Sequence, residues 1–168
     1  MTFAKSEEDF CFLCPENSKE YKIWRQVGAT FGQNDTRYLS VYIDHDFEQY
    51  QTLNLDNQDN PIYQNEKYSV FEELFPNTPF ELVFVPNKHY RQTNDMLNSQ
   101  EGLNTFADIV QTINDLRVYL DIYEISIHFN DRSPNFNGLM EHPHIHIATH
   151  SKSENLYQRA RDFFNEKP

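Results

Sequence analysis

The sequence predicts an α+β fold in which an antiparallel sheet is covered by one long helix and followed by a C-terminal helix. The segments 68–74, 80–85 and 124–129 are predicted to be strands, because 80–85 is apolar enough for a central strand and apolar residues alternate with a period of two in 124–129. A helical period replaces that alternation over 103–120 and again near the C-terminus. With 168 residues and no internal repeat, we expect residues 1–168 to form a single domain.

The N-terminal part gives weaker signals. Residues 21–31 and 38–43 alternate well enough to be strands, with a turn at 32–35. The segment 44–65 is rich in Asp, Asn and Gln and contains Pro61, so we predict a polar loop or insertion there.

The central part contains two strands, Tyr68–Leu74 and Phe80–Val85, and then the long helix. Asn98 or Ser99 is the expected N-cap, with Glu101 as the acid of a capping box. The residues predicted to face the core recur at helical spacing: Leu103, Phe106, Val110, Ile113, Leu116 or Arg117, and Leu120.

The C-terminal part contains a strand at Glu124–Phe129, a loop, a histidine-rich strand and the last helix. Ser151 with Glu154 is the expected cap of this helix. Its inward residues are predicted to be Leu156, Ala160 and Phe163 or Phe164.

The histidine-rich strand, residues 141–150, holds four of the seven histidines. Alternation sends the imidazoles to one face and the isoleucines to the other: His142, His144, His146 and His150 against Ile145 and Ile147. Like-facing side chains lie about 7 Å apart along a strand, so the imidazoles can line a phosphate-sized pocket. Surface histidines, satisfied core histidines and plain metal ligands are the alternative interpretations.

The charge balance limits the partners. A net charge of −12 argues against binding to polymeric nucleic acid or to an anionic membrane, because both are repelled. Residues 1–10 lack the apolar core of a secretory signal, and no run approaches the roughly 20 apolar residues of a membrane span. We therefore expect a cytoplasmic protein.

Cys11 and Cys14 are the only cysteines. A disulfide between them would close a very short loop and stabilise little. Pro15 and Asn17 place a turn after Cys14, and no buried strand precedes Cys11, so the C-x-x-C pair favours zinc over a redox motif. A tetrahedral zinc site needs two further ligands, which must be histidines elsewhere in the chain.

Three separated segments resemble the histidine-triad (HIT) proteins and the related galactose-1-phosphate uridylyltransferases. Cys11-Phe12-Leu13-Cys14 with Asn17 is similar to the opening of the transferases. The segment 81–89, followed by Asp95, resembles the strand, proline, basic residue and histidine of both branches. His142-Pro143-His144 is similar to the transferase motif, while His146 completes the triad of the hydrolases.

The resemblance implies a HIT-like sheet and a structural zinc held by Cys11, Cys14, His89 and His142. It also implies a nucleotide hydrolase or nucleotidyltransferase acting at the α-phosphate of a small-molecule nucleotide conjugate. His144 would be the nucleophile that forms a nucleotidyl-histidine intermediate. The resemblance also implies that His146 contacts the phosphate oxygens and that Asn130 contacts the phosphate or orients the site.

Two features depart from the family pattern. Glu141 stands where many hydrolases carry a serine, and only Lys88, Arg91 and Arg132 are nearby cations. The uridylyltransferases contain two related halves and this chain has one, so a homodimer could supply a second wall of the pocket.

Two alternative functions remain open at this point. The chain could be a non-catalytic nucleotide-binding or zinc-stabilised interaction protein. It could also be a metalloenzyme in which His142, His144 and His146 hold a catalytic metal.

Overall fold

The computed structural model describes residues 13–17, 19, 61–73, 76–130 and 142–168. The predicted strands 21–31 and 38–43, residues 44–60 of the predicted loop, and Cys11 lie outside these residues. The helices and strands follow in the order η2 (Pro15–Asn17), β1 (Tyr63–Gln64), β2 (Tyr68–Glu72), β3 (Phe80–Pro86), α3 (Thr93–Leu97), α4 (Gln100–Leu120), β4 (Ser126–Asn130), β5 (His144–Thr149) and α5 (Leu156–Glu166).

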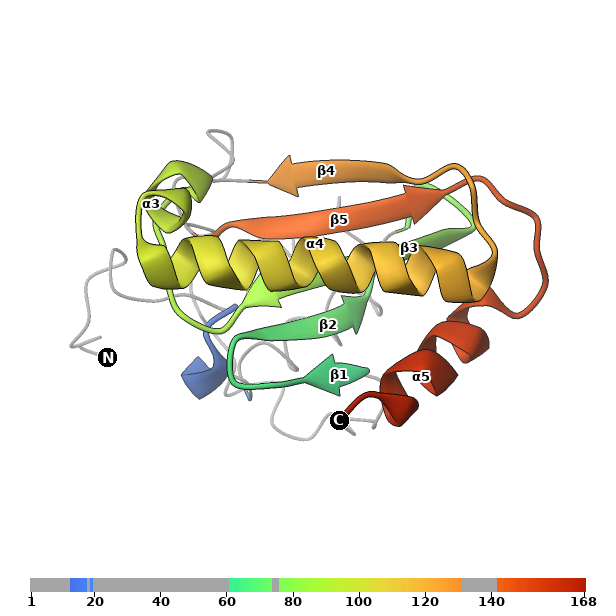
Figure 1. The fold of residues 1–168 in the computed structure, drawn as a ribbon, viewed down its shortest axis with the longest axis horizontal. Helices are drawn as coiled ribbons and strands as arrows, with labels where there is room; N and C mark the ends of the chain where they lie inside the picture. Colours follow the sequence, from blue (N-terminus) through green and yellow to red (C-terminus); the bar gives the residue numbers. More distant parts are fainter. Residues whose placement is uncertain (1–12, 18, 20–60, 74–75, 131–141) are drawn as a thin grey trace, which may run out of the picture.

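The strands form one antiparallel sheet with the order β1-β2-β3-β5-β4. Helix α4 runs across one face of this sheet, and α5 packs beside α4 and β1 (Figure 1). The predicted α+β fold, with an antiparallel sheet, one long helix and a C-terminal helix, is therefore confirmed. None of the helices that the structure describes is long and apolar enough to cross a membrane.

The core lies between α4 and the facing side of the sheet. Alternation within each strand sends every second residue into this layer, where burial of apolar surface stabilises the fold. The strand residues in the core are Tyr68, Val70, Phe80, Leu82, Phe84, Ile145 and Ile147. From the helices come Ile109, Ile113, Leu116, Leu120, Leu156, Ala160 and Phe164.

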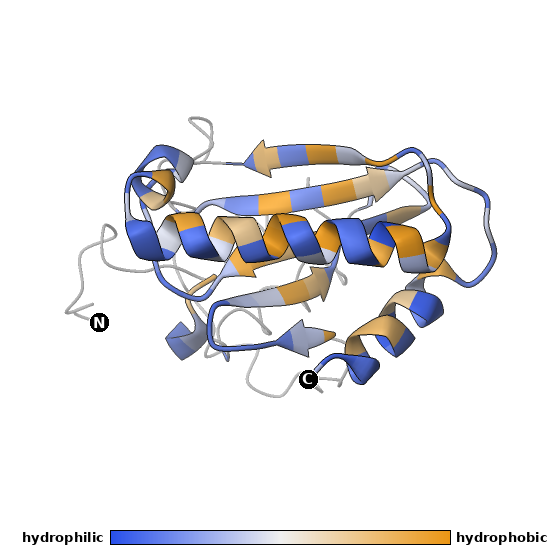
Figure 2. Cartoon of the chain, in the orientation of Figure 1, coloured by the Kyte–Doolittle hydropathy of each residue, from blue (hydrophilic) through white to orange (hydrophobic). Residues whose placement is uncertain are grey.

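The inward face of α4 agrees with the prediction in part, because Ile113, Leu116 and Leu120 are buried as expected. Leu103 and Val110, predicted as core residues, are 45% and 40% exposed, whereas Ile109 is fully buried. The true inward face includes the buried Thr105 and Thr112, which do not count as apolar in a pattern search. Hydrophobic residues therefore also recur on the outer part of α4 (Figure 2).

The predicted N-cap Ser99 of α4 is confirmed, whereas the predicted capping box of α4 and the predicted cap of α5 are wrong. Ser99 is the N-cap of α4, but its hydroxyl accepts the hydrogen bond of Gly102 N–H, and Glu101 pairs with Lys88 instead of closing a capping box. Helix α5 begins after Asn155, which has a left-handed backbone with a φ of 59°. Ser151 donates its backbone N–H to the Thr149 hydroxyl and lies just after β5, so it does not cap α5.

In residues 61–65, the described part of the predicted loop 44–65, the structure has a short strand. Tyr63 and Gln64 form β1 and pair with Val70 and Ser69 of β2. The ring of Tyr63 stacks on Phe164 at 5.1 Å between centroids, and this contact gives the polar segment an apolar anchor.

Candidate functional site

The face of the sheet opposite α4 carries the candidate site. Because Ile145 and Ile147 point into the core, His144 and His146 point to this second face. The predicted separation of imidazoles from isoleucines is confirmed for these two histidines. His142 precedes β5 and His150 follows it, so neither lies on the strand itself.

The ring of His144 is held by the backbone of its own segment. Its Nδ1 lies 3.0 Å from the carbonyl oxygen of His142. A carbonyl only accepts hydrogen bonds, so Nδ1 carries the proton and Nε2 keeps the lone pair. His144 is 7% exposed, and the predicted site residue Asn130 is its direct partner across the β4–β5 pair.

The ring of His146 is held by carboxylates. Its Nδ1 lies 2.9 Å from Glu81 Oε1 and 3.3 Å from Glu73 Oε2. The His144 and His146 rings are neighbours, with 5.0 Å between centroids. The sequence did not identify Glu81 or Glu73 as site residues; the only signal was an acid within the apolar run of β3.

A tyrosine hydroxyl of α5 lies at the same acidic cluster. The backbone N–H of Glu81 donates to the Tyr157 hydroxyl at 3.1 Å. Burial raises the pKa of Tyr157, and the nearby carboxylates of Glu72, Glu81 and Glu73 raise it further. Tyr157 is therefore neutral at physiological pH and adds no further negative charge.

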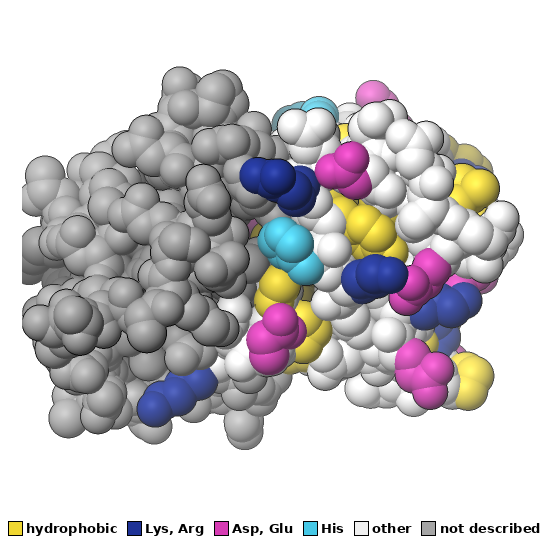
Figure 3. All heavy atoms as spheres, turned by 90° about the vertical axis from the view of Figure 1, so that its left-hand side faces the viewer, with side chains coloured by type: hydrophobic (Ala, Val, Ile, Leu, Met, Phe, Trp, Pro, Cys, Tyr) yellow, Lys and Arg dark blue, Asp and Glu magenta, His cyan; other side chains and the backbone are white. Residues whose placement is uncertain are grey.

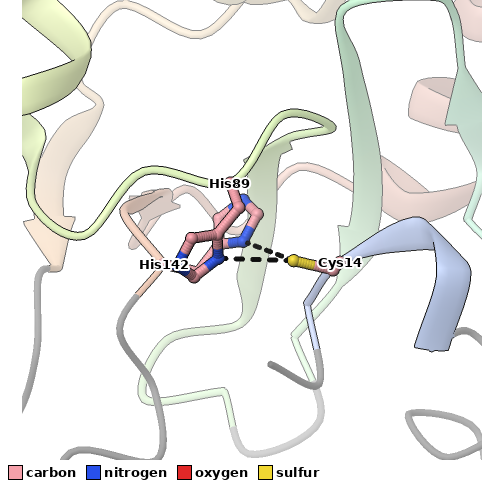
Figure 4. Close-up of side chains that lie close together, drawn as sticks. All are labelled: Cys14, His89 and His142. Atoms are coloured by element: carbon pink, nitrogen blue, oxygen red, sulfur yellow. Dashed lines mark hydrogen bonds between the residues drawn. The ribbon is translucent and has the colours of Figure 1, made fainter. Parts of the chain in front are cut away.

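A second group of side chains brings together three segments that are distant in the sequence. Cys14 Sγ lies 3.3 Å from His89 Nδ1 and 3.6 Å from His142 Nδ1 (Figure 4). A tetrahedral zinc with Zn–S of about 2.3 Å and Zn–N of about 2.05 Å separates these atoms by about 3.6 Å. The three donors therefore fit a zinc ion, and three of the four predicted ligands converge.

The second nitrogen of His142 supports the same interpretation. Nε2 donates to the Pro86 carbonyl oxygen at 2.6 Å, so Nδ1 is the nitrogen that can coordinate a metal. His142 and Cys14 are buried, while His89 is exposed. The predicted fourth ligand, Cys11, lies outside the described residues.

The charged residues near His89 form pairs. Lys88 forms an ion pair with Glu101, and this contact raises the pKa of Lys88. Figure 3 shows histidine side chains at this end of the molecule among acidic and basic ones. Arg91 is exposed, and Arg132 and Glu141 lie outside the described residues.

The triad histidines are not grouped as a shared metal site in the part of the chain that the structure describes. His142 belongs to the donor group with Cys14 and His89, and His146 belongs to a group with Glu73 and Glu81. His144 belongs to neither. This grouping does not favour a catalytic metal held by all three.

No family model and no curated protein matches this chain. Among solved structures, it is similar to a histidine triad protein from Clostridium difficile, with 21% identity over 57% of this chain and 83% of the other and a TM-score of 0.45. A HIT-like protein from Bartonella henselae is 18% identical over 61% and 84%, with a TM-score of 0.48. A zinc-bound histidine triad family protein from Mycobacterium smegmatis is 19% identical over 60% and 78%, with a TM-score of 0.44. Similarity at this level says nothing about the activity of this chain.

Proposed function

We propose that this protein is a nucleotide hydrolase or nucleotidyltransferase that attacks the α-phosphate of a nucleotide conjugate with His144. The hydrogen bond from His144 Nδ1 to the His142 carbonyl carries this proposal. It leaves the lone pair on Nε2, as a neutral imidazole nucleophile requires.

The proposed reaction has two displacements at phosphorus. In the first, His144 Nε2 forms a bond to the α-phosphorus, and the P–O bond to the leaving group breaks with its electron pair on oxygen. In the second, an oxygen of water or of a phosphate acceptor forms a new P–O bond, and the P–N bond breaks with its electron pair on Nε2, which restores His144; when water is the acceptor, its proton is released to solvent. Transfer to a sugar phosphate, as in the uridylyltransferases, rests on the sequence resemblance alone.

His146 and Asn130 are the proposed contacts of the phosphoryl group. Both flank His144: the His146 ring is 5.0 Å away between centroids, and Asn130 is the cross-strand partner of His144. Hydrogen-bond donors from these side chains would stabilise the charge that builds up on the phosphoryl oxygens in the transition state.

A structural zinc is the second part of the proposal. Cys14, His89 and His142 would hold the ion together with Cys11, and a Cys2His2 set is closed and leaves no position for substrate. The ion would tie the N-terminal turn to the residue that precedes the nucleophile's strand.

The reaction is tested by incubating the protein with a panel of labelled nucleotide conjugates and quenching the mixture with a denaturant at alkaline pH, where P–N bonds survive. We expect one label per chain, located on His144 by peptide mass spectrometry and released by acid. Binding of a nucleotide without any label on the protein would contradict the proposed chemistry and would support the non-catalytic alternative.

We further propose that the protein is a homodimer. Strand β4 is an edge strand, and its residues Ile127 and Phe129 are 41% and 49% exposed. Ile127 and Phe129 continue the outer apolar face of α4, on which Leu103 and Val110 are exposed. The rings of Phe106 in α4 and Phe129 in β4 are neighbours, with 5.7 Å between their centroids. An open strand edge beside an apolar surface is typical of a self-pairing interface.

Light scattering is expected to give twice the chain mass of 20.1 kDa. Phe129→Glu would place a charge in the centre of the contact and shift the protein to the monomer mass. Gln64→Glu is the matched control, because Gln64 is exposed on β1, the strand at the opposite edge of the sheet from β4, and it should leave the dimer intact. A monomeric wild-type protein would remove this proposal.

A further inference from the structure

We propose that Glu81 is a positioning residue for His146. Its carboxylate accepts the Nδ1–H of His146 and thereby fixes the ring with Nε2 directed at the phosphoryl group of the substrate. This inference rests on the proposed function, because it assigns a role to a residue of the same site.

The Glu81 carboxylate is itself fixed in place. Glu81 is only 5% exposed, although it lies at an alternating position of β3 on the same face as His146. One oxygen lies 2.9 Å from His146 Nδ1, and the other accepts the Asn77 backbone N–H at 2.9 Å. A buried carboxylate held through both oxygens leaves the imidazole little rotational freedom.

The other nitrogen of His146 remains available. Across the described part of the chain, no hydrogen bond involves His146 Nε2. The Tyr90 hydroxyl is the single buried side-chain nitrogen or oxygen there that lacks a partner, so Nε2 is not a buried atom. Nε2 therefore reaches solvent while Nδ1 is engaged. A donor to a bound phosphoryl oxygen requires this orientation together with a proton on Nε2, so the His146 ring would act in its doubly protonated form.

The two neighbouring imidazoles are supported by different chemistry. His144 Nδ1 meets a neutral carbonyl, which sets the tautomer of a neutral nucleophile. His146 Nδ1 meets a carboxylate, which accepts the ring N–H and fixes the orientation of the ring. The sheet thus provides one ring suited to attack phosphorus and one suited to donate a hydrogen bond to the phosphoryl oxygens.

Glu73 adds a second carboxylate, with Oε2 at 3.3 Å from the same nitrogen. The donor atoms of Glu73, Glu81 and His146 lie within 4.8 Å of one another, so a divalent cation is the competing occupant of this cluster. The 2.9 Å separation of Glu81 Oε1 from His146 Nδ1 is an ordinary hydrogen-bond length, which favours a direct hydrogen bond between them over a bridging cation.

The test compares Glu81→Gln with Glu72→Gln in the full-length, zinc-loaded protein. Glutamine preserves the size of the side chain and removes its charge. Glu72 is the matched control, because it lies on the neighbouring strand β2 and pairs with Arg161 of α5. Equal melting temperatures would establish that both variants are folded.

The first readout is the ¹⁵N spectrum of the histidine rings in the substrate-free protein, with His146 assigned from His146→Asn. We expect a protonated Nδ1 on His146 in the wild type and in Glu72→Gln, and an altered signal in Glu81→Gln. The second readout is turnover: Glu81→Gln should lower kcat by about 10- to 100-fold with a smaller change in KM, as loss of an outer partner of a functional histidine does elsewhere.

Three results would overturn the inference: an unprotonated Nδ1 in the wild type, an unchanged kcat in Glu81→Gln, or a second bound metal ion per chain that Glu81→Gln removes. A wild-type protein that forms no nucleotidyl-histidine would overturn the proposed function and the catalytic part of this inference together. The ring spectrum needs no turnover and therefore distinguishes the two failures.

Discussion

Replacing His144 by alanine is expected to abolish turnover, with kcat lower by about 10⁴-fold or more. The proposed reaction forms a bond between His144 Nε2 and phosphorus, and no other group can substitute for an attacking atom that is missing. The zinc content and the fold should remain as in the wild type, because the imidazole of His144 belongs to neither donor group.

The control for this variant is His150→Ala, which removes an exposed imidazole just beyond the end of β5. It should keep wild-type turnover, zinc content and melting temperature. Steady-state kinetics on the best substrate of the nucleotide panel and acid-labile labelling give the comparison. Retained turnover or a retained label in His144→Ala would remove the assignment of the nucleophile.

The regular elements were predictable because their patterns are strong. Apolar runs on either side of a turn located β2 and β3 to within two residues at either end, and alternation assigned Ile145 and Ile147 of β5 to the core. The long helix was found for the same reason, and its buried residues Ile113, Leu116 and Leu120 agree with the prediction.

The errors have specific physical causes. The inward face of α4 uses Thr112, whose hydroxyl lies 2.7 Å from that of Tyr68 inside the core, and a pattern of apolar residues alone passes over it. The exposed Leu103 and Val110 were assigned to the core because apolar residues also recur on the outer part of α4. The N-cap Ser99 of α4 was predicted correctly, but Glu101 pairs with Lys88 instead of completing a capping box.

The candidate site was predictable only in part. Its histidines stand out in the sequence, and the resemblance to histidine-triad proteins implied that Cys14, His89 and His142 would meet, which they do. Glu81 gave no comparable signal, because its partner His146 is 65 residues away and a single acid in a strand is usually exposed.

Replacing Cys14 by serine is expected to remove one zinc ion per chain and to lower the melting temperature by about 10 °C or more. Binding of a structural zinc contributes about 10–16 kcal/mol to the free energy of folding in small zinc domains. In a chain of this size, the loss of a fraction of that free energy is enough to lower the melting temperature by about 10 °C. The loss should be large because Cys14 is buried and lies next to both histidine donors.

The same substitution is expected to reduce turnover although Cys14 is not proposed to touch the substrate. His142 is both a proposed zinc ligand and the residue whose carbonyl accepts the His144 Nδ1–H, so release of the metal would loosen the hydrogen bond that sets the nucleophile's tautomer. Elemental analysis, thermal unfolding and kcat are measured on Cys14→Ser beside the zinc-retaining His150→Ala. A Cys14→Ser protein with full zinc content would contradict the metal site, and one that loses zinc yet keeps wild-type kcat would contradict its coupling to His144.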